Sequence, residues 1–113
     1  MAYQFVTPIL LAQSAITTDY IAVYTVPENT RTYVKDITIT NTTGSTIRIY
    51  VSLVPDEGAP GASNALFYNT ILPAYTVVQW TGAQIMNVSD TVQVKASAAG
   101  CTVNVTGGEA QRP

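Results

Sequence analysis

The chain has 113 residues, of which 47% are hydrophobic and only 11% are charged, and its net charge is −2. This length suits one domain with one core, and with so few charges neutral polar side chains must cover most of the surface. The five basic residues are scattered, which excludes a basic patch for nucleic acid. No apolar run approaches the length needed to span a bilayer, so no membrane partner is expected.

The composition favours β-sheet. Thr, Val, Ile and Tyr together supply 46 of the 113 residues, and their β-branched or aromatic side chains suit a pleated surface. Cys101 is the single cysteine, so no intrachain disulfide can hold the fold. Stability must therefore come from an apolar core or from neighbouring subunits.

The N-terminal residues 1–19 are rich in apolar side chains but do not alternate well. Two interpretations remain open, because termini are often ordered only when something holds them. The segment is either an edge strand on its own sandwich or an arm that reaches a neighbouring subunit. As an arm, it would make its contacts through Tyr3, Phe5, Val6, Ile9, Leu10 and Leu11.

Residues 20–109 read as short strands separated by turn residues, which is typical of a sandwich or barrel. The predicted strands are residues 20–26, 31–40, 46–54, 65–72, 75–80, 84–88, 91–98 and 101–106. Gly82 is expected to allow a sharp change of direction, and Gly107-Gly108 to free a C-terminal tail at residues 110–113. The fold class is therefore all-β, an antiparallel sandwich of about eight strands of jelly-roll or Greek-key type, almost without helix. A small closed barrel is the structural alternative.

Two strands carry local predictions. In residues 31–40, a β-bulge near Lys35-Asp36 would bring Val34, Ile37 and Ile39 to one inner face. In residues 46–54, strict alternation places Ile47, Ile49, Val51 and Leu53 inward and Thr46, Arg48, Tyr50 and Ser52 outward. The outward Tyr50 beside Arg48 is either a cross-strand pair or part of a contact surface.

Residues suited to catalysis or metal binding are scarce in the chain. The chain has no histidine, which removes the commonest general base and the commonest zinc ligand. Cys101 lies on the apolar phase of its strand, so we interpret it as a core residue and not as a nucleophile. The carboxylates lie at turns or strand ends, where residues such as Asp56 and Asp90 accept bonds from backbone amides. We therefore predict no enzyme activity, no cofactor and no metal.

Aromatic residues leave one further possibility. One interpretation makes Trp80, Tyr75, Tyr68 and Tyr50 a platform for sugar rings, as in lectin-like sandwiches. Trp80 shares its phase with Thr76 and Val78, which favours a core position for it. A carbohydrate-binding module is thus the competing function from another class.

Four stretches of the chain resemble small virion proteins of tailed bacteriophages. They are YTVPENTR at residues 24–31, ITITNTTG at 37–44, ILPAYTVV at 71–78, and VSDTVQV at 88–94 continuing to TGGE at 106–109. The resemblance covers residues 20–109 and its motifs mark turns, not active sites. Ser89 stands where similar sequences often have Gly, and residues 56–64 are particular to this chain.

The resemblance implies a capsid decoration (cement) protein of jelly-roll type on the outer head surface, or a tail or baseplate component of similar fold. Such a protein is often trimeric, and its expected partners are itself and the major capsid protein or other virion proteins. Its expected location is the virion, assembled in the host cytoplasm. Low charge and an apolar N-terminal segment also suit symmetric assembly.

Overall fold

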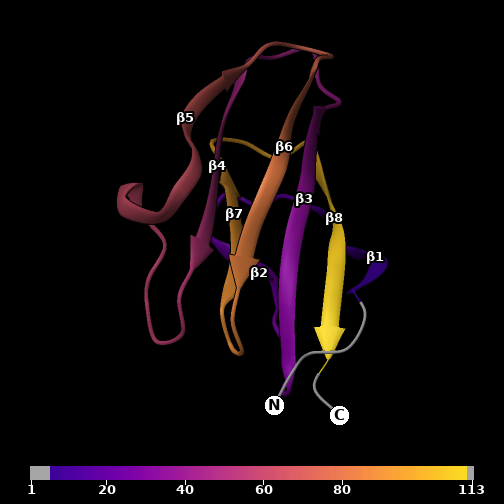
Figure 1. Ribbon diagram of the computed structural model, residues 1–113. Coiled ribbons are helices and arrows are strands. Elements are labelled where there is room, and N and C mark those ends of the chain that lie inside the picture. The colour runs from indigo at the N-terminus through magenta and orange to yellow at the C-terminus, as the bar shows by residue number, and fades with distance from the viewer. Residues whose placement is uncertain (1–5, 112–113) are drawn as a thin grey trace.

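The computed structural model describes residues 6–111, which consist almost entirely of β-strands (Figure 1). Within these residues the one helical element is a short 3₁₀ turn, η1, at Ala62–Asn64. The strands are β1 (Val6–Ala15), β2 (Ile21–Thr25), β3 (Thr30–Asn41), β4 (Ile47–Val54), β5 (Ala65–Leu72), β6 (Val77–Met86), β7 (Thr91–Ala96) and β8 (Cys101–Gln111).

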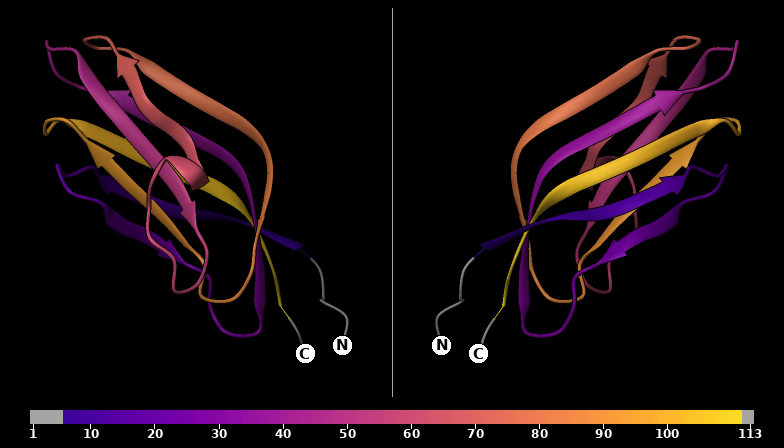
Figure 2. Two further views of the ribbon diagram at one scale, coloured as in Figure 1. Left: turned by 90° about the vertical axis from the view of Figure 1, so that its left-hand side faces the viewer. Right: turned by 90° about the vertical axis from the view of Figure 1, so that its right-hand side faces the viewer.

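The strands form two four-stranded antiparallel sheets packed face to face, as the side views in Figure 2 show. One sheet has the order β1-β8-β3-β6 and the other β2-β7-β4-β5. Consecutive strands lie next to each other only at β4-β5, so the chain crosses repeatedly from one sheet to the other. Eight strands interleaved in this way form a jelly roll, which confirms the predicted fold class.

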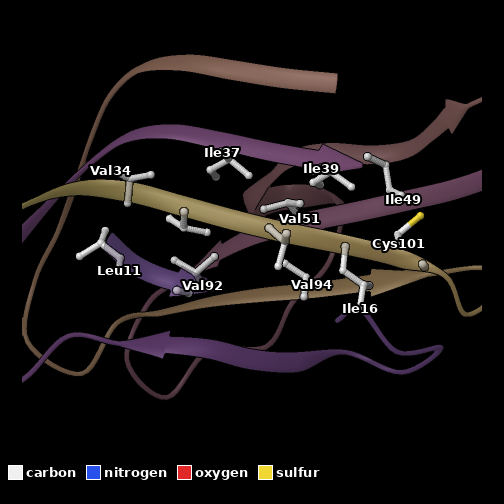
Figure 3. Close-up of a cluster of buried hydrophobic side chains, with 14 of the residues drawn as sticks. Leu11, Ile16, Val34, Ile37, Ile39, Ile49, Val51, Val92, Val94 and Cys101 are labelled. Carbon is white, nitrogen blue, oxygen red and sulfur yellow. The ribbon is translucent and has the colours of Figure 1, made fainter. Parts of the chain in front are cut away.

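The core lies between the sheets and is built from β-branched side chains (Figure 3). Ile37 and Ile39 of β3 contribute from one sheet, and Ile49 and Val51 of β4 from the other; all four are fully buried. Alternation along each strand places these residues on one face, so the period-two pattern of the sequence produces the core directly. Cys101 lies at one end of this cluster and is 1% exposed, as predicted.

The predicted bulge in β3 is present. The register of β3 with both of its neighbours shifts between Val34 and Asp36. Val34, Ile37 and Ile39 are all buried although they do not share a simple alternation, and Lys35 at the irregularity is exposed. The bulge therefore keeps one apolar face continuous along a twelve-residue strand.

The N-terminal segment forms an edge strand over Val6–Ala15, where β1 pairs antiparallel with β8. Its register shifts between Leu10 and Ala12, so that the consecutive residues Leu11 and Ala12 are both buried. This irregularity explains why the segment does not alternate in the sequence. Tyr3 and Phe5, which were predicted to contact a partner, lie outside the described residues.

The prediction of two strands around Gly82 is wrong. Residues 77–86 form one strand, β6, which pairs with β3 on both sides of that glycine. Gly82 lies opposite the β3 bulge, where the extra chain length is absorbed without a turn. The glycine therefore marks a bulge, a role that isolated glycines in strands also serve.

The prediction that Gly107-Gly108 frees the tail is also wrong. β8 continues through both glycines to Gln111 and pairs there with β1 and β3. A Cβ atom on Gly107 would lie 1.9 Å from the backbone oxygen of Tyr33. Gly107 is thus required by the close approach of the β3 backbone and does not mark the start of a flexible tail.

The outward phase of β4 departs from the prediction at its end. Ser52 is fully buried, whereas Leu53 is only half-buried. The Ser52 hydroxyl donates a 3.4 Å hydrogen bond to the Gly61 carbonyl, because the loop of residues 55–64 folds over this part of the sheet. A loop whose apolar residues are only alanine and proline therefore covers Ser52.

Candidate interaction surfaces

The predicted contact residues of β1 separate into packed and exposed positions. Val6 begins the strand opposite Ala110 of β8. Leu11 is part of the core at 9% exposure, and Ile9 is half-buried and packs against it. Leu10 points outward and is 54% exposed. Within the described part of this strand, Leu10 is therefore the large apolar side chain that remains available to a partner.

Arg48 and Tyr50 lie on the outer face of the other sheet, β2-β7-β4-β5, so they do not form one patch with Leu10. Ile49 and Val51 on either side of Tyr50 face the core, which turns Tyr50 outward. Arg48 is exposed and lies opposite Ile71 of β5, which is 55% exposed. The two predicted residues thus belong to a larger surface that three other strands help to build.

At the centre of this surface is a group that we call the tyrosine–lysine cluster: Tyr20, Tyr50, Tyr68 and Lys95. The ring of Tyr50 stands edge-to-face against Tyr20 at 6.4 Å and against Tyr68 at 5.4 Å between centroids. The Lys95 Nζ lies 4.9 Å from the centroid of Tyr50 and 5.3 Å from that of Tyr20. These are favourable aromatic and cation–π geometries, so the four side chains support one another.

Strand register explains why these residues meet. Tyr50 of β4 lies directly opposite Lys95 of β7, and Tyr20 immediately precedes β2, the next strand across the sheet. Tyr68 projects from β5 on the other side, and the Tyr50 hydroxyl donates a 3.0 Å hydrogen bond to the side chain of Asn69. Asn69 has a positive φ of 51°, a left-handed conformation that asparagine tolerates better than most residues, and it interrupts the regular geometry of β5 beside Tyr68.

Sequence reasoning identified Tyr50 and Tyr68 but missed Tyr20 and Lys95. The missing signal was the strand order, since a jelly roll places β7 between β2 and β4 and so brings Lys95 beside Tyr50. Trp80 is not part of the cluster, because it belongs to β6 of the opposite sheet and packs against the core. Tyr75 is 75% exposed and also lies away from these strands, next to Gly44.

The outer face of the sheet β1-β8-β3-β6 has a different character. Gln13 of β1 donates a 2.8 Å hydrogen bond to Asn104 of β8, and Thr38 of β3 donates one of the same length to Asp36. Gln79 of β6 also donates to the Asp36 carboxylate. Neutral polar side chains thus run across all four strands, as the low charge content of the chain predicts.

Glu109 takes part in a polar contact between the two sheets. Tyr24 of β2 donates a hydrogen bond from its hydroxyl to the Glu109 carboxylate of β8. The Thr32 hydroxyl of β3 lies 2.6 Å from the same tyrosine oxygen and is its donor, since the one hydroxyl proton of Tyr24 is already used. Burial, followed by the bond to Glu109, raises the pKa of Tyr24 above its usual range.

Asp90 and Cys101 serve the fold and not a reaction. Asp90 accepts hydrogen bonds from the backbone amides of Asn87 at 2.9 Å and Asp56 at 3.0 Å, as predicted for a turn aspartate. Burial raises the pKa of the Cys101 thiol, which keeps it protonated. Among residues 6–111, no group of three or more potential ligands is placed to hold a metal ion. The same residues include no helix with the length and apolar character needed to cross a bilayer.

No protein-family model matches the chain, and neither does any curated protein. Solved structures do match. A chain of the Bacillus endospore appendages, which form a novel family of disulfide-linked pili, aligns with a TM-score of 0.57 and 10% identity, over 100% of this chain and 96% of that one. A chain of infectious bursal disease virus, Gx strain, aligns with a TM-score of 0.53 and 11% identity, over 95% of this chain.

The shared feature is the jelly-roll fold. Identities of 10% and 11% are too low to carry more than architecture. The chain spans about a third of the viral chain, 32%, so it corresponds to one part of a larger protein there. The pilus chain, in contrast, matches over nearly its whole length.

Proposed function

We propose that this chain is a structural protein of a bacteriophage particle, a capsid decoration (cement) protein that binds and stabilises the outer head surface as an oligomer. The observation that carries the proposal is the tyrosine–lysine cluster on a jelly roll. The jelly roll is a fold used by viral capsid domains, and the sequence resemblance over residues 20–109 favours the same role. The proposal assigns the chain no catalytic activity.

The cluster has the chemistry of a protein contact surface. Tyrosine and arginine dominate the few residues that supply most of the binding energy in interfaces. Tyr68 is 54% exposed, and Arg48 and Ile71 extend the same face beyond it. The aromatic rings are already held by each other and by Lys95, so little side-chain entropy is lost when a partner covers them.

The proposed partners are further copies of the chain, most simply a homotrimer, and the major capsid protein or another virion protein. The particle is assembled in the host cytoplasm. No direct contact with nucleic acid or membrane is proposed. Arg48 and Lys95 are the basic residues of the contact face, and two such charges are too few to neutralise a run of phosphates.

A tail or baseplate component of similar fold is the first alternative, since the same surface would serve there. The second is a carbohydrate-binding module, which the exposed Tyr68 favours. Against it, the Tyr50 ring stands at 67° to Tyr20 and 84° to Tyr68, so the three rings do not form one flat strip. A sugar chain that stacks along a surface needs such a strip.

The test is co-sedimentation of the purified chain with heads and, separately, tails of the virus that encodes it. The wild type is expected to bind heads. Tyr50→Ala should weaken this binding about tenfold, equivalent to about 1.4 kcal/mol, because it removes the ring that contacts both other tyrosines. Lys95→Ala should also weaken the binding, because it removes the cation that holds the Tyr20 and Tyr50 rings.

Tyr33→Ala is the matched control, since Tyr33 is a half-buried tyrosine on the outer face of the opposite sheet. Its binding to heads should equal that of the wild type. Binding to tails alone would support the tail alternative. Retention on immobilised glycans that is lost in Tyr50→Ala, without binding to either particle, would support the carbohydrate alternative.

A further inference from the structure

β6 is an outer strand with one unpaired side. It pairs with β3, and no other strand of the described chain lies on its far side (Figure 1). Its ten residues contain neither a charged residue nor a proline. The free N–H and C=O groups along such an edge are a template for another strand, and proteins usually block them.

The other three outer strands carry protective features that β6 lacks. β1 contains Pro8 and has a register shift beside Leu10. β2 is only five residues long. β5 is interrupted at Asn69, whose φ is positive, and its pairing with β4 shifts twice. Proline, short length and local distortion each discourage edge-to-edge pairing, so β6 is the least protected edge in residues 6–111.

Exposed apolar side chains gather at this edge. Seven large hydrophobic residues of the described chain are exposed, and four of them lie on β6 or within two residues of its ends. Val77 is 58% exposed and Ile85 is 61% exposed, both on the outer face of the strand. Tyr75 precedes the strand at 75% exposure and Val88 follows it at 38%.

The positions of these residues are symmetric about Thr81. Val77 lies four residues before Thr81, and Ile85 lies four residues after it. When two identical strands pair antiparallel about a twofold axis, a residue a given number of positions before the central residue faces the residue the same number of positions after it in the other copy. A pair centred on Thr81 therefore places Val77 opposite Ile85 of a second copy, twice, and Thr81 opposite itself. Both are favourable cross-strand pairs.

The same register fits the inner face of the strand. Trp80 would lie opposite Gly82 of the second copy, so the largest side chain of β6 faces the smallest. An aromatic residue across from an edge glycine is a recognised stabilising arrangement in sheets. Because the strand has no charge, no like charges meet in any of these pairs.

We propose that β6 is a self-association site, at which two copies pair antiparallel about a twofold axis through Thr81 and join their β1-β8-β3-β6 sheets into one continuous sheet. This inference rests on the self-association in the proposed function and adds the strand and the register. A twofold contact is distinct from the threefold contact of a trimer. The chain therefore forms dimers, or hexamers where trimers are also present.

The test is the molar mass of purified variants by light scattering and sedimentation. Val77→Lys/Ile85→Lys places lysine opposite lysine twice, and it should halve the mass of the wild type. Val77→Lys/Ile85→Glu places lysine opposite glutamate twice, and it should restore the wild-type mass in low salt and lose it as salt is added. Both variants change exposed side chains, and circular dichroism and thermal unfolding check that each remains folded.

Gln13→Lys is the matched control, because Gln13 is also exposed and lies on β1, the opposite edge of the same sheet. Its mass should not change. A wild type that is monomeric or trimeric, or a Lys/Lys variant with the wild-type mass, overturns the β6 contact. A trimer in that case leaves the proposed function intact, so the two failures are distinguishable.

A cross-linking experiment tests the register. Thr81→Cys should form a disulfide-linked dimer under mild oxidation, since directly opposed residues in an antiparallel pair lie within disulfide range. Gln79→Cys, on the same face of the same strand, faces Ala83 of the second copy and should link slowly. Equal rates for the two variants would overturn the register centred on Thr81.

Discussion

Tyr24 shows how one side chain joins the two sheets. It projects from β2, and its hydroxyl group meets Thr32 of β3 and Glu109 of β8, strands of the opposite sheet. The contact depends on a protonated hydroxyl, because a phenolate beside the Glu109 carboxylate would be repelled and poorly solvated. The bridge is therefore sensitive to alkaline conditions.

The pH dependence of stability has a definite sign. The pKa of Tyr24 is raised on folding, so its stabilising contribution is complete below the unfolded pKa of about 10 and declines as pH rises above it. Tyr24→Phe should lower the free energy of unfolding by about 1 kcal/mol near neutral pH. In urea titrations, the difference from the wild type should stay constant up to about pH 9 and shrink as the pH rises above about 10.

Tyr75→Phe is the control for that measurement, since Tyr75 is largely exposed. Its stability should follow that of the wild type throughout. A difference between Tyr24→Phe and the wild type that stays constant with pH would contradict the assigned role of the hydroxyl proton.

At the scale of elements, the irregular strands distinguish this sandwich from an idealised one. β3 bulges at Lys35, and β8 and β6 accommodate that bulge on either side. The alternation of β3 predicted its bulge, because three apolar residues had to reach one face. The responses of β8 and β6 were not predicted, since nothing local to Gly107 or Gly82 identifies the strand that lies beside it.

Gly107→Ala tests how β8 accommodates the bulge of β3. The added Cβ would meet Tyr33 and Lys35 backbone atoms, which cannot rotate away as a side chain can. We expect a loss of about 3 kcal/mol in the free energy of unfolding, in the upper part of the usual range. Chemical denaturation measures it.

Gly61→Ala serves as the reference for this substitution. A Cβ at Gly61 has no atom within 4 Å, and its φ of 175° is extended backbone. Its stability should change by less than about 0.5 kcal/mol. A similar loss in both variants would show that the close approach of β3 and β8 is not the cause.

At the scale of the whole molecule, the two sheets protect a single thiol. Cys101 is 1% exposed in β8, which is paired on both sides. A thiol reagent can reach it only when the sandwich opens, because the side chain points between the sheets. Labelling should therefore be slow in the native protein, and its rate should rise with urea in parallel with unfolding. Rapid labelling without denaturant would contradict the packed core.

The fold class, most of the core and the β3 bulge could be predicted from the amino-acid sequence alone. These follow from period-two alternation, which is a local property: a residue's phase along its own strand decides whether it faces the core. The same reasoning placed Arg48 and Tyr50 outside and Cys101 inside.

Which strands are neighbours became known only from the packed sheets. Lys95 joins Tyr50, and Glu109 joins Tyr24, because the jelly-roll order brings together strands that are far apart in the chain. It also left β6 as an unprotected edge, whereas β8, equally free of proline, became a central strand. Alternation specifies the face of each residue but carries no information on the adjacent strand, so surfaces built across strands emerge only when the sheets assemble.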